Sequence, residues 1–395
     1  MKPQIAWSNR RSQESPTAFS EFKSIAIFLR LSGISIATIQ QPNSVWSILY
    51  TGFSASFFAI SFAFVASEIL FCGATNYVET SVVTFNFFVL VSSCVLWIIV
   101  QRRSFQFVQL LEDITNTHAS VSKTWHLNLR KSMIAIFTYI CLIPFVTSLP
   151  SLIAVQEDSL KFYLHCYLYG SELTNLGNFG KIALLFIFLT VENFLHFFFP
   201  NVVVVLIFFL CECQRQTVAS YSEQLPRRLL TDKNNSKVDK AVELYAKLRK
   251  DFIHLRDLTS LPISLILTQK FLTLFFSLTV LLSNDTRSIF VEIIESTCYA
   301  ANAILGLILI ILSASKIREA HGKIREQCLD VSLGLRQDSK GLELLHLLKS
   351  FVEREDMTMT AAGIVLLKRG LILKLGASLI TYGVIIVQLD STKKG

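Results

Sequence analysis

Hydrophobic residues of this chain gather in seven long segments that carry almost no charge. About 20 residues of helix cross the roughly 30 Å hydrocarbon core of a bilayer, and a helix bonds its own backbone where lipid offers no partner. The pattern therefore predicts an all-α polytopic membrane protein with seven transmembrane helices. The predicted spans are Val45–Phe71, Ser81–Val100, Ser132–Val155, Ile182–Cys211, Leu261–Ser283, Phe290–Ser313 and Leu371–Leu389.

The composition agrees with a membrane protein. Hydrophobic residues make up 52% of the chain and charged residues 17%, below the roughly 25% of ordinary soluble domains. The sequence has no Gly-rich phosphate loop, no H-E-x-x-H and no G-x-S-x-G motif, and its cysteines and histidines lack the spacing of metal ligands. We therefore expect no catalytic residue, no metal and no cofactor, and a protein that is not an enzyme.

Basic residues set the predicted orientation. Of the 37 Lys and Arg residues, 30 lie in the segments 1–44, 101–131, 212–260 and 314–370. The positive-inside rule places these segments in the cytoplasm, so the N-terminus is predicted inside and the C-terminus outside. The pI near 9.0 then reflects topology, and we expect no nucleic-acid partner.

The spans and loops divide the chain into seven predicted regions. These are a cytoplasmic tail 1–44, transmembrane helices one to four in 45–211, a cytoplasmic anchor segment 212–260, helices five and six in 261–313, a second anchor segment 314–370, the last helix 371–389 and an extracellular tail 390–395. The layout predicts a multi-pass protein of the plasma membrane.

Both anchor segments carry apolar residues at spacings of three and four, which predicts amphipathic helices. The first stripe is Val238, Val242, Tyr245, Leu248, Phe252 and Leu255, and the second is Leu344, Leu345, Leu348, Phe351 and Val352. Such stripes lie on lipid headgroups or pack against each other below the membrane. Because two neighbouring loops each supply one, we favour packing into a helical anchor.

The last span gathers its polar residues on one side. At 100° per residue, an arc of about 80° holds Lys374, Ser378, Thr381 and Gln388. Ile385 lies on the same arc and Leu389 lies at its edge. One interpretation is a pore wall that these two aliphatic residues close by dewetting. The other is a buried face that hydrogen-bonds to neighbouring helices.

Ionisable residues inside the other spans are few, and each has two interpretations. Glu192 and His196 share one face of the fourth span, where they contact a ligand or ion, or form an interhelical hydrogen bond. Lys270 in the fifth span is ambiguous: if the fifth helix begins in the cytoplasm, its amine extends to the inner interface and needs no special role. Asn284 begins an Asn-Asp-Thr triplet in an outer turn, which is a candidate glycosylation site or a chance occurrence.

The end of the chain carries a family resemblance. Thr381-Tyr382-Gly383-Val384-Ile385-Ile386-Val387-Gln388-Leu389 resembles the Thr-Tyr, five apolar residues, Gln-Phe ending of arthropod gustatory receptors. Seven spans, an internal N-terminus and a long third cytoplasmic loop also resemble the related insect odorant receptors. Leu389 stands where gustatory receptors usually have Phe, and in this it resembles the odorant co-receptor.

The resemblance implies a ligand-gated, non-selective cation channel for a small organic, tastant-like ligand. It implies a homotetramer around the last helix, or an assembly with related receptor subunits, in contact with membrane lipids and permeant cations. Ile385 and Leu389 would form the gate, Gln388 would lie beside it, and Tyr382 would pack against adjacent helices. A ligand pocket is implied among helices two to six, for which geometry alone suggests Phe145, Thr147, Phe188, Glu192, Phe275 and Tyr299.

Two other classes of membrane protein fit the sequence less well. A G-protein-coupled receptor needs an external N-terminus, against the distribution of basic residues, and the sequence lacks its Asp-Arg-Tyr-like and Asn-Pro-x-x-Tyr motifs. A secondary transporter often shows inverted repeats and helices broken near the midplane, and we find no repeat.

Overall fold

The structure is a computed structural model that describes residues 80–122, 177–230, 235–282, 289–334 and 356–394, with scattered helical positions in 52–66, 136–148 and 346–353. Helices dominate these residues. In chain order the elements are α3 (Thr80–Val121), α6 (Asn178–Asn193), the π-helical turn η2 (Phe194–Phe198), α7 (Phe199–Leu230), α8 (Asn235–Leu282), α9 (Ile289–Gly334), β1 (Thr360–Ala361), β2 (Val365–Leu366) and α11 (Gly370–Lys394).

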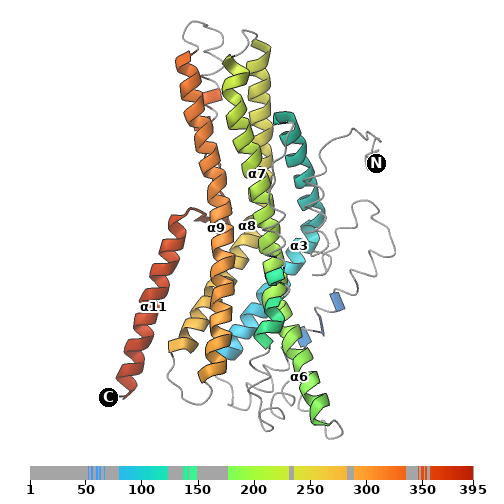
Figure 1. Cartoon of the computed structure of the whole chain (residues 1–395), viewed down its shortest axis with the longest axis vertical. Coiled ribbons are helices and arrows are strands. Elements are labelled where there is room, and N and C mark those ends of the chain that lie inside the picture. Colours follow the sequence, from blue (N-terminus) through green and yellow to red (C-terminus); the bar gives the residue numbers. More distant parts are fainter. Residues whose placement is uncertain are drawn as a thin grey trace.

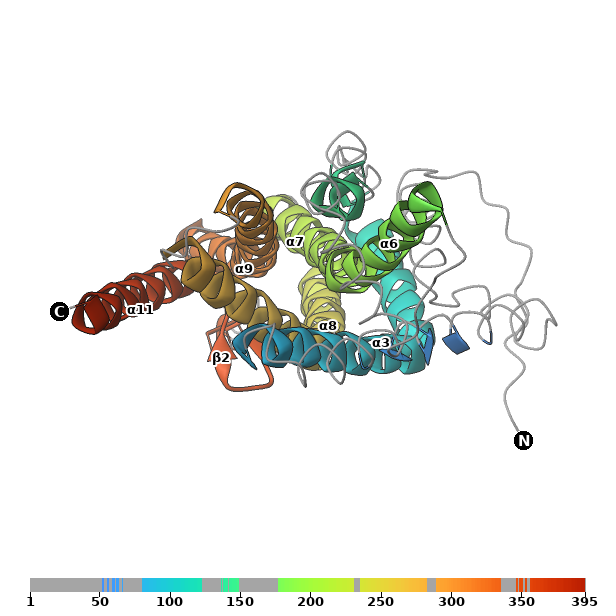
Figure 2. The same ribbon diagram turned by 90° about the horizontal axis from the view of Figure 1, so that it is seen from below.

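Four long helices form a bundle. Helices α7, α8 and α9 run side by side with α3 beside them, while α11 lies along one flank (Figure 1). Seen from below, α11 stands at the edge of the molecule next to α8 and α9, on the side away from α6 (Figure 2). The 48 residues of α8 extend about 70 Å at 1.5 Å per residue, more than twice the hydrocarbon thickness of a bilayer. The long helices therefore reach well beyond any membrane they cross.

Among the described residues, five helices are long and apolar enough to span a membrane. They are α3, α7, α8, α9 and α11, and α6 is a shorter apolar helix. This confirms the prediction of a helical, multi-pass membrane protein. The predicted first span Val45–Phe71 and third span Ser132–Val155 lie mostly outside the described residues.

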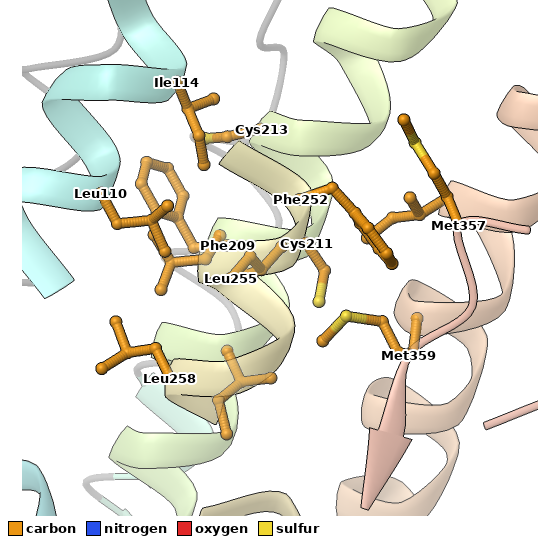
Figure 3. Packing of buried hydrophobic residues seen from close by; sticks show 14 of the residues in the cluster. Leu110, Ile114, Phe209, Cys211, Cys213, Phe252, Leu255, Leu258, Met357 and Met359 are labelled. Atoms are coloured by element: carbon orange, nitrogen blue, oxygen red, sulfur yellow. The ribbon is translucent and has the colours of Figure 1, made fainter. Parts of the chain in front are cut away.

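The largest hydrophobic core fills the bundle away from the C-terminal end of α11. Figure 3 shows Leu110 and Ile114 of α3, Phe209, Cys211 and Cys213 of α7, Phe252, Leu255 and Leu258 of α8, and Met357 and Met359 meeting in this core. Members of both predicted amphipathic stripes are fully buried in it, namely Leu248 and Leu255 from the first, and Leu348 and Val352 from the second. The two stripes thus share one core.

A short hairpin joins this core to α11 and departs from the all-α expectation. Strands β1 and β2 pair antiparallel, with Ala361 opposite Val365. Its turn is left-handed at Ala362 (φ 51°) and Gly363 (φ 72°). The Ala362 N–H donates to the Ser260 carbonyl at 3.0 Å, and the Gly363 N–H donates to Ser260 Oγ at 3.2 Å. These bonds fix the start of α11 to α8.

The π-helical turn η2 lies directly before Pro200 on the path from α6 to α7. Proline has no N–H and its ring crowds the carbonyl four residues earlier, so a regular α-helical bond is lost there. The helix widens by one residue, and the Phe199 N–H donates to the Phe194 carbonyl five positions back. Such turns are frequent at functional sites, and this one directs Phe197 toward α9.

Candidate functional site

One side of α11, its attached side, packs against α8 of the same chain. Tyr382 stacks on Phe275 of α8 with ring centroids 3.4 Å apart, and its hydroxyl lies 3.5 Å from Thr279 Oγ1. Gly383 also lies against α8, because a Cβ at this position would be in van der Waals contact with Leu278 Cδ2 at 3.4 Å. Leu379 packs on a small cluster between α8 and α9. The Tyr-Gly pair of the C-terminal motif therefore faces α8.

The polar arc of α11 is exposed in the single chain. Its four polar side chains are exposed: Lys374, Ser378, Thr381 and Gln388. The hydroxyls of Ser378 and Thr381 donate to their own helix, to the carbonyls of Lys374 at 3.0 Å and Ala377 at 2.9 Å. Ile385 on the same arc is 46% exposed. The side chain of Leu389 lies outside the described residues.

A third face of α11 is apolar and also exposed. An arc of about 60° holds Leu373, Ile380, Val384 and Val387. Leu373 is 77% exposed and Ile380 is 71% exposed. The helix thus has one attached side, one exposed polar side and one exposed apolar side.

A buried polar cluster joins three helices deep in the bundle. Lys270 of α8 is 2% exposed, and its Nζ donates to Asn201 Oδ1 of α7 at 2.8 Å. Asn201 Nδ2 in turn donates to Asn302 Oδ1 of α9 at 2.7 Å. Gly306 makes room for the lysine, because a Cβ there would lie 3.1 Å from Lys270 Cε. Lys270 therefore does not extend to an interface, contrary to the sequence expectation.

Further polar bonds continue from this cluster along the same level of the bundle. Gln269 Nε2 donates to Ser93 Oγ of α3 at 3.2 Å. On the other side, the Tyr299 hydroxyl donates to Asn193 Oδ1 at 3.4 Å, and Asn193 Nδ2 donates to Ser148 Oγ at 3.0 Å. These bonds fix the rotation of the helices about their axes.

A small cavity opens beside the cluster, between α3, η2, α8 and α9. Aromatic and polar groups both line it: Phe85, Val89, Phe197, Gln269, Lys270, Thr273, Tyr299 and Asn302. Its volume is about 10 Å³, which is room for roughly one water molecule. Pockets for small organic ligands measure roughly 300–1,000 Å³. A ligand can bind here only if the surrounding helices move apart.

The residues suggested from the sequence for a ligand pocket do not form one group. Tyr299 lines the cavity, whereas Phe275 is covered by Tyr382 of α11. Thr147 and Phe188 are buried, and Phe145 is 49% exposed. The Glu192 side chain and Asn284 lie outside the described residues.

Sequence reasoning missed Asn201, Asn302 and the burial of Lys270. The sequence feature that could have indicated the cluster is an amide side chain within an apolar segment on each of α7 and α9. The described residues bring no three metal-ligating side chains together.

Comparisons with known proteins agree with this architecture. The sequence profile of the family described as 7tm Chemosensory receptor matches residues 33–393. The fold is similar to the insect olfactory receptor OR5 from Machilis hrabei, with a TM-score of 0.69 and 12% identity over 94% of this chain and 98% of that chain. The same receptor in complex with eugenol gives the same values. A search of curated protein sequences gives no match.

The family match confirms the chemoreceptor resemblance found in the C-terminal motif, and it favours this class over a G-protein-coupled receptor. It is a family of receptors and not of enzymes. With 361 of its 395 residues inside the matched range, the chain belongs to the 7tm chemosensory receptor family.

Proposed function

We propose that this receptor is a ligand-gated, non-selective cation channel of the plasma membrane, formed by four copies of the chain around a pore lined by α11. The observation that carries the proposal is the division of α11 into three faces. Its attached face holds Tyr382 against α8, and its polar and apolar faces are both exposed.

A tetramer gives each exposed face a suitable neighbour. An amine, an amide and two hydroxyls facing acyl chains are costly. A water-filled axis hydrates them, and an adjacent subunit or lipid covers Leu373, Ile380 and Val384. Alternatively the polar arc packs against another protein surface. The pore arrangement accounts for both faces with one assembly.

The gate in this proposal is a ring of aliphatic side chains near the outer end of α11. Ile385 lies on the polar arc between Thr381 and Gln388, and Leu389 follows one turn later. A narrow ring of such side chains excludes water and blocks ions without any moving plug. Turning Ile385 off the axis would leave the polar residues to line an open path.

Helix α8 offers a direct route from ligand to gate. Lys270 and Thr273 line the cavity, and Phe275 and Thr279, two and six residues beyond Thr273, contact Tyr382 of α11. A small organic ligand that enlarges the cavity would move this part of α8. Because such a ligand binds the expanded arrangement more tightly, it shifts the closed–open equilibrium.

Whole-cell recordings of two matched variants test the proposal. Ile385→Ser places a hydroxyl in the proposed gate and should give a cation current without ligand. Val387→Ser makes the same chemical change about 160° around α11 and should stay closed. No leak in Ile385→Ser, or equal leak in both variants, would contradict the pore assignment.

A further inference from the structure

The buried Lys270 indicates which class of ligand the cavity takes. We propose that the cavity binds small carboxylic acids with an aromatic or other apolar body, and that Lys270 and Asn302 bind the carboxylate. The inference deepens the proposed function and rests on its assignment of the cavity as the ligand site.

The position of Lys270 is unusual for a basic residue in an apolar helix segment. It lies about 13 Å or more along α8 from either end of the predicted span Leu261–Ser283. Lysines in such segments usually reach an interface with their amine, but this side chain is 2% exposed and its stem packs against Gly306. The fold therefore keeps the amine of Lys270 buried among the helices, far from either end of the predicted span.

The hydrogen bonds around Lys270 leave donors unused. An ammonium group has three N–H donors, and within the described residues Nζ makes one bond, to Asn201 Oδ1. Because Asn201 Nδ2 donates to Asn302 Oδ1, the amide of Asn302 presents its NH₂ group elsewhere. Asn302 Nδ2 has no hydrogen bond within the described residues, and both Lys270 and Asn302 line the cavity. Two donor groups thus converge there.

A carboxylate complements these donors better than a neutral group does. It accepts several hydrogen bonds and donates none, and its charge would balance the ammonium form of Lys270, which has no ion pair with a described acidic side chain. Alcohols and amides would supply a donor as well, and an apolar ligand would leave the remaining N–H donors of Lys270 without an acceptor. The donor set therefore selects for an anion.

The remaining walls define the body of the ligand. Phe85, Val89, Phe197 and Tyr299 are apolar or aromatic, and Phe197 lies against Tyr299 with ring centroids 4.8 Å apart. Since the cavity has a volume of about 10 Å³, room for roughly one water molecule, an acid of roughly ten heavy atoms must separate these two rings. Its carboxylate then lies beside Lys270 while its body fills the opened space.

Ligand-induced thermal stabilisation of the purified full-length receptor in detergent tests the inference. The probes are phenylacetate, benzoate and octanoate, each compared with its methyl ester. We expect at least one acid to stabilise the receptor at a concentration about tenfold lower than its ester, the discrimination expected of a charge-assisted bond. In Lys270→Met the acid should lose about tenfold in affinity, and the ester should change little.

A second variant keeps the test informative if Lys270→Met does not fold. Lys270→Gln keeps an N–H donor for Asn201 but removes the charge, and it should lose the preference for the acid. The inference is overturned if acid and ester bind equally, if the preference survives in the folded variants, or if no acid of the panel binds. The channel proposal is judged separately by the current of Ile385→Ser, which needs no ligand.

Discussion

Replacing Asn201 by alanine removes the amide that joins Lys270 on α8 to Asn302 on α9. In the folded chain this amide accepts a hydrogen bond of 2.8 Å from Lys270 Nζ and donates one of 2.7 Å to Asn302 Oδ1. All three side chains are buried away from bulk water. Interhelical hydrogen bonds in membrane proteins average roughly 0.6 kcal/mol and reach about 1.7 kcal/mol. Losing two therefore predicts about 1–3 kcal/mol of destabilisation for Asn201→Ala.

A double-mutant cycle with Lys270→Met isolates the lysine bond. In the Lys270→Met background, Asn201→Ala removes only the bond to Asn302, so its cost should fall by about 0.6–1.7 kcal/mol. The assay is SDS-driven unfolding of the purified receptor in mixed micelles, which gives a free energy for each variant.

Thr268→Ala is the matched control on the same helix. Its hydroxyl donates to the Ser264 carbonyl on an exposed side of α8, so the expected change is within about 0.5 kcal/mol. Additive costs in the cycle would show that Lys270 and Asn201 do not interact. A cost for Asn201→Ala no larger than that of Thr268→Ala would refute the buried cluster itself.

Three further predictions concern other parts of the chain. Tyr382→Ala removes the ring stacked on Phe275, so the ligand-evoked current should fall while ligand binding is retained. Tyr382→Phe keeps the ring and should behave as wild type. Loss of ligand binding in Tyr382→Ala would contradict this prediction. Ala362 has a left-handed backbone conformation (φ 51°), which glycine adopts without steric strain. Ala362→Gly should therefore stabilise the receptor by about 0.5–1 kcal/mol in the same SDS titration. A loss of stability would show that the backbone at Ala362 is not strained. Burial lowers the pKa of His321, which lies beyond the predicted span and contacts the Tyr245 hydroxyl at 3.0 Å, to about 4. The uncharged His321 side chain therefore contributes its full stabilisation above about pH 6.5, and this stabilisation is lost as the pH falls toward 4. The melting temperature of the receptor should drop between pH 7 and 5. His321→Gln should reduce that drop.

The amino-acid sequence by itself determined the class of architecture and the family. Hydrophobic length is a local property, and lipid leaves the backbone little choice but helix, so α3, α7, α8, α9 and α11 follow from composition along the chain. The polar arc of α11 follows equally from helical periodicity, and the C-terminal motif that includes Tyr382 pointed to the chemoreceptor family that the profile match confirms.

Only the tertiary structure decided which side chains meet. The sequence expectation for Lys270 was an interfacial amine, because hydropathy says nothing about how a helix is rotated toward its neighbours. Its bond to Asn201 spans 69 residues, and the bond from Asn201 to Asn302 spans 101. The widened turn before Pro200 and the hairpin held by Ser260 likewise depend on packing between distant segments. Helix formation is set by neighbours in sequence, whereas the cavity is set by the relative rotation and depth of four helices, which only their mutual packing fixes.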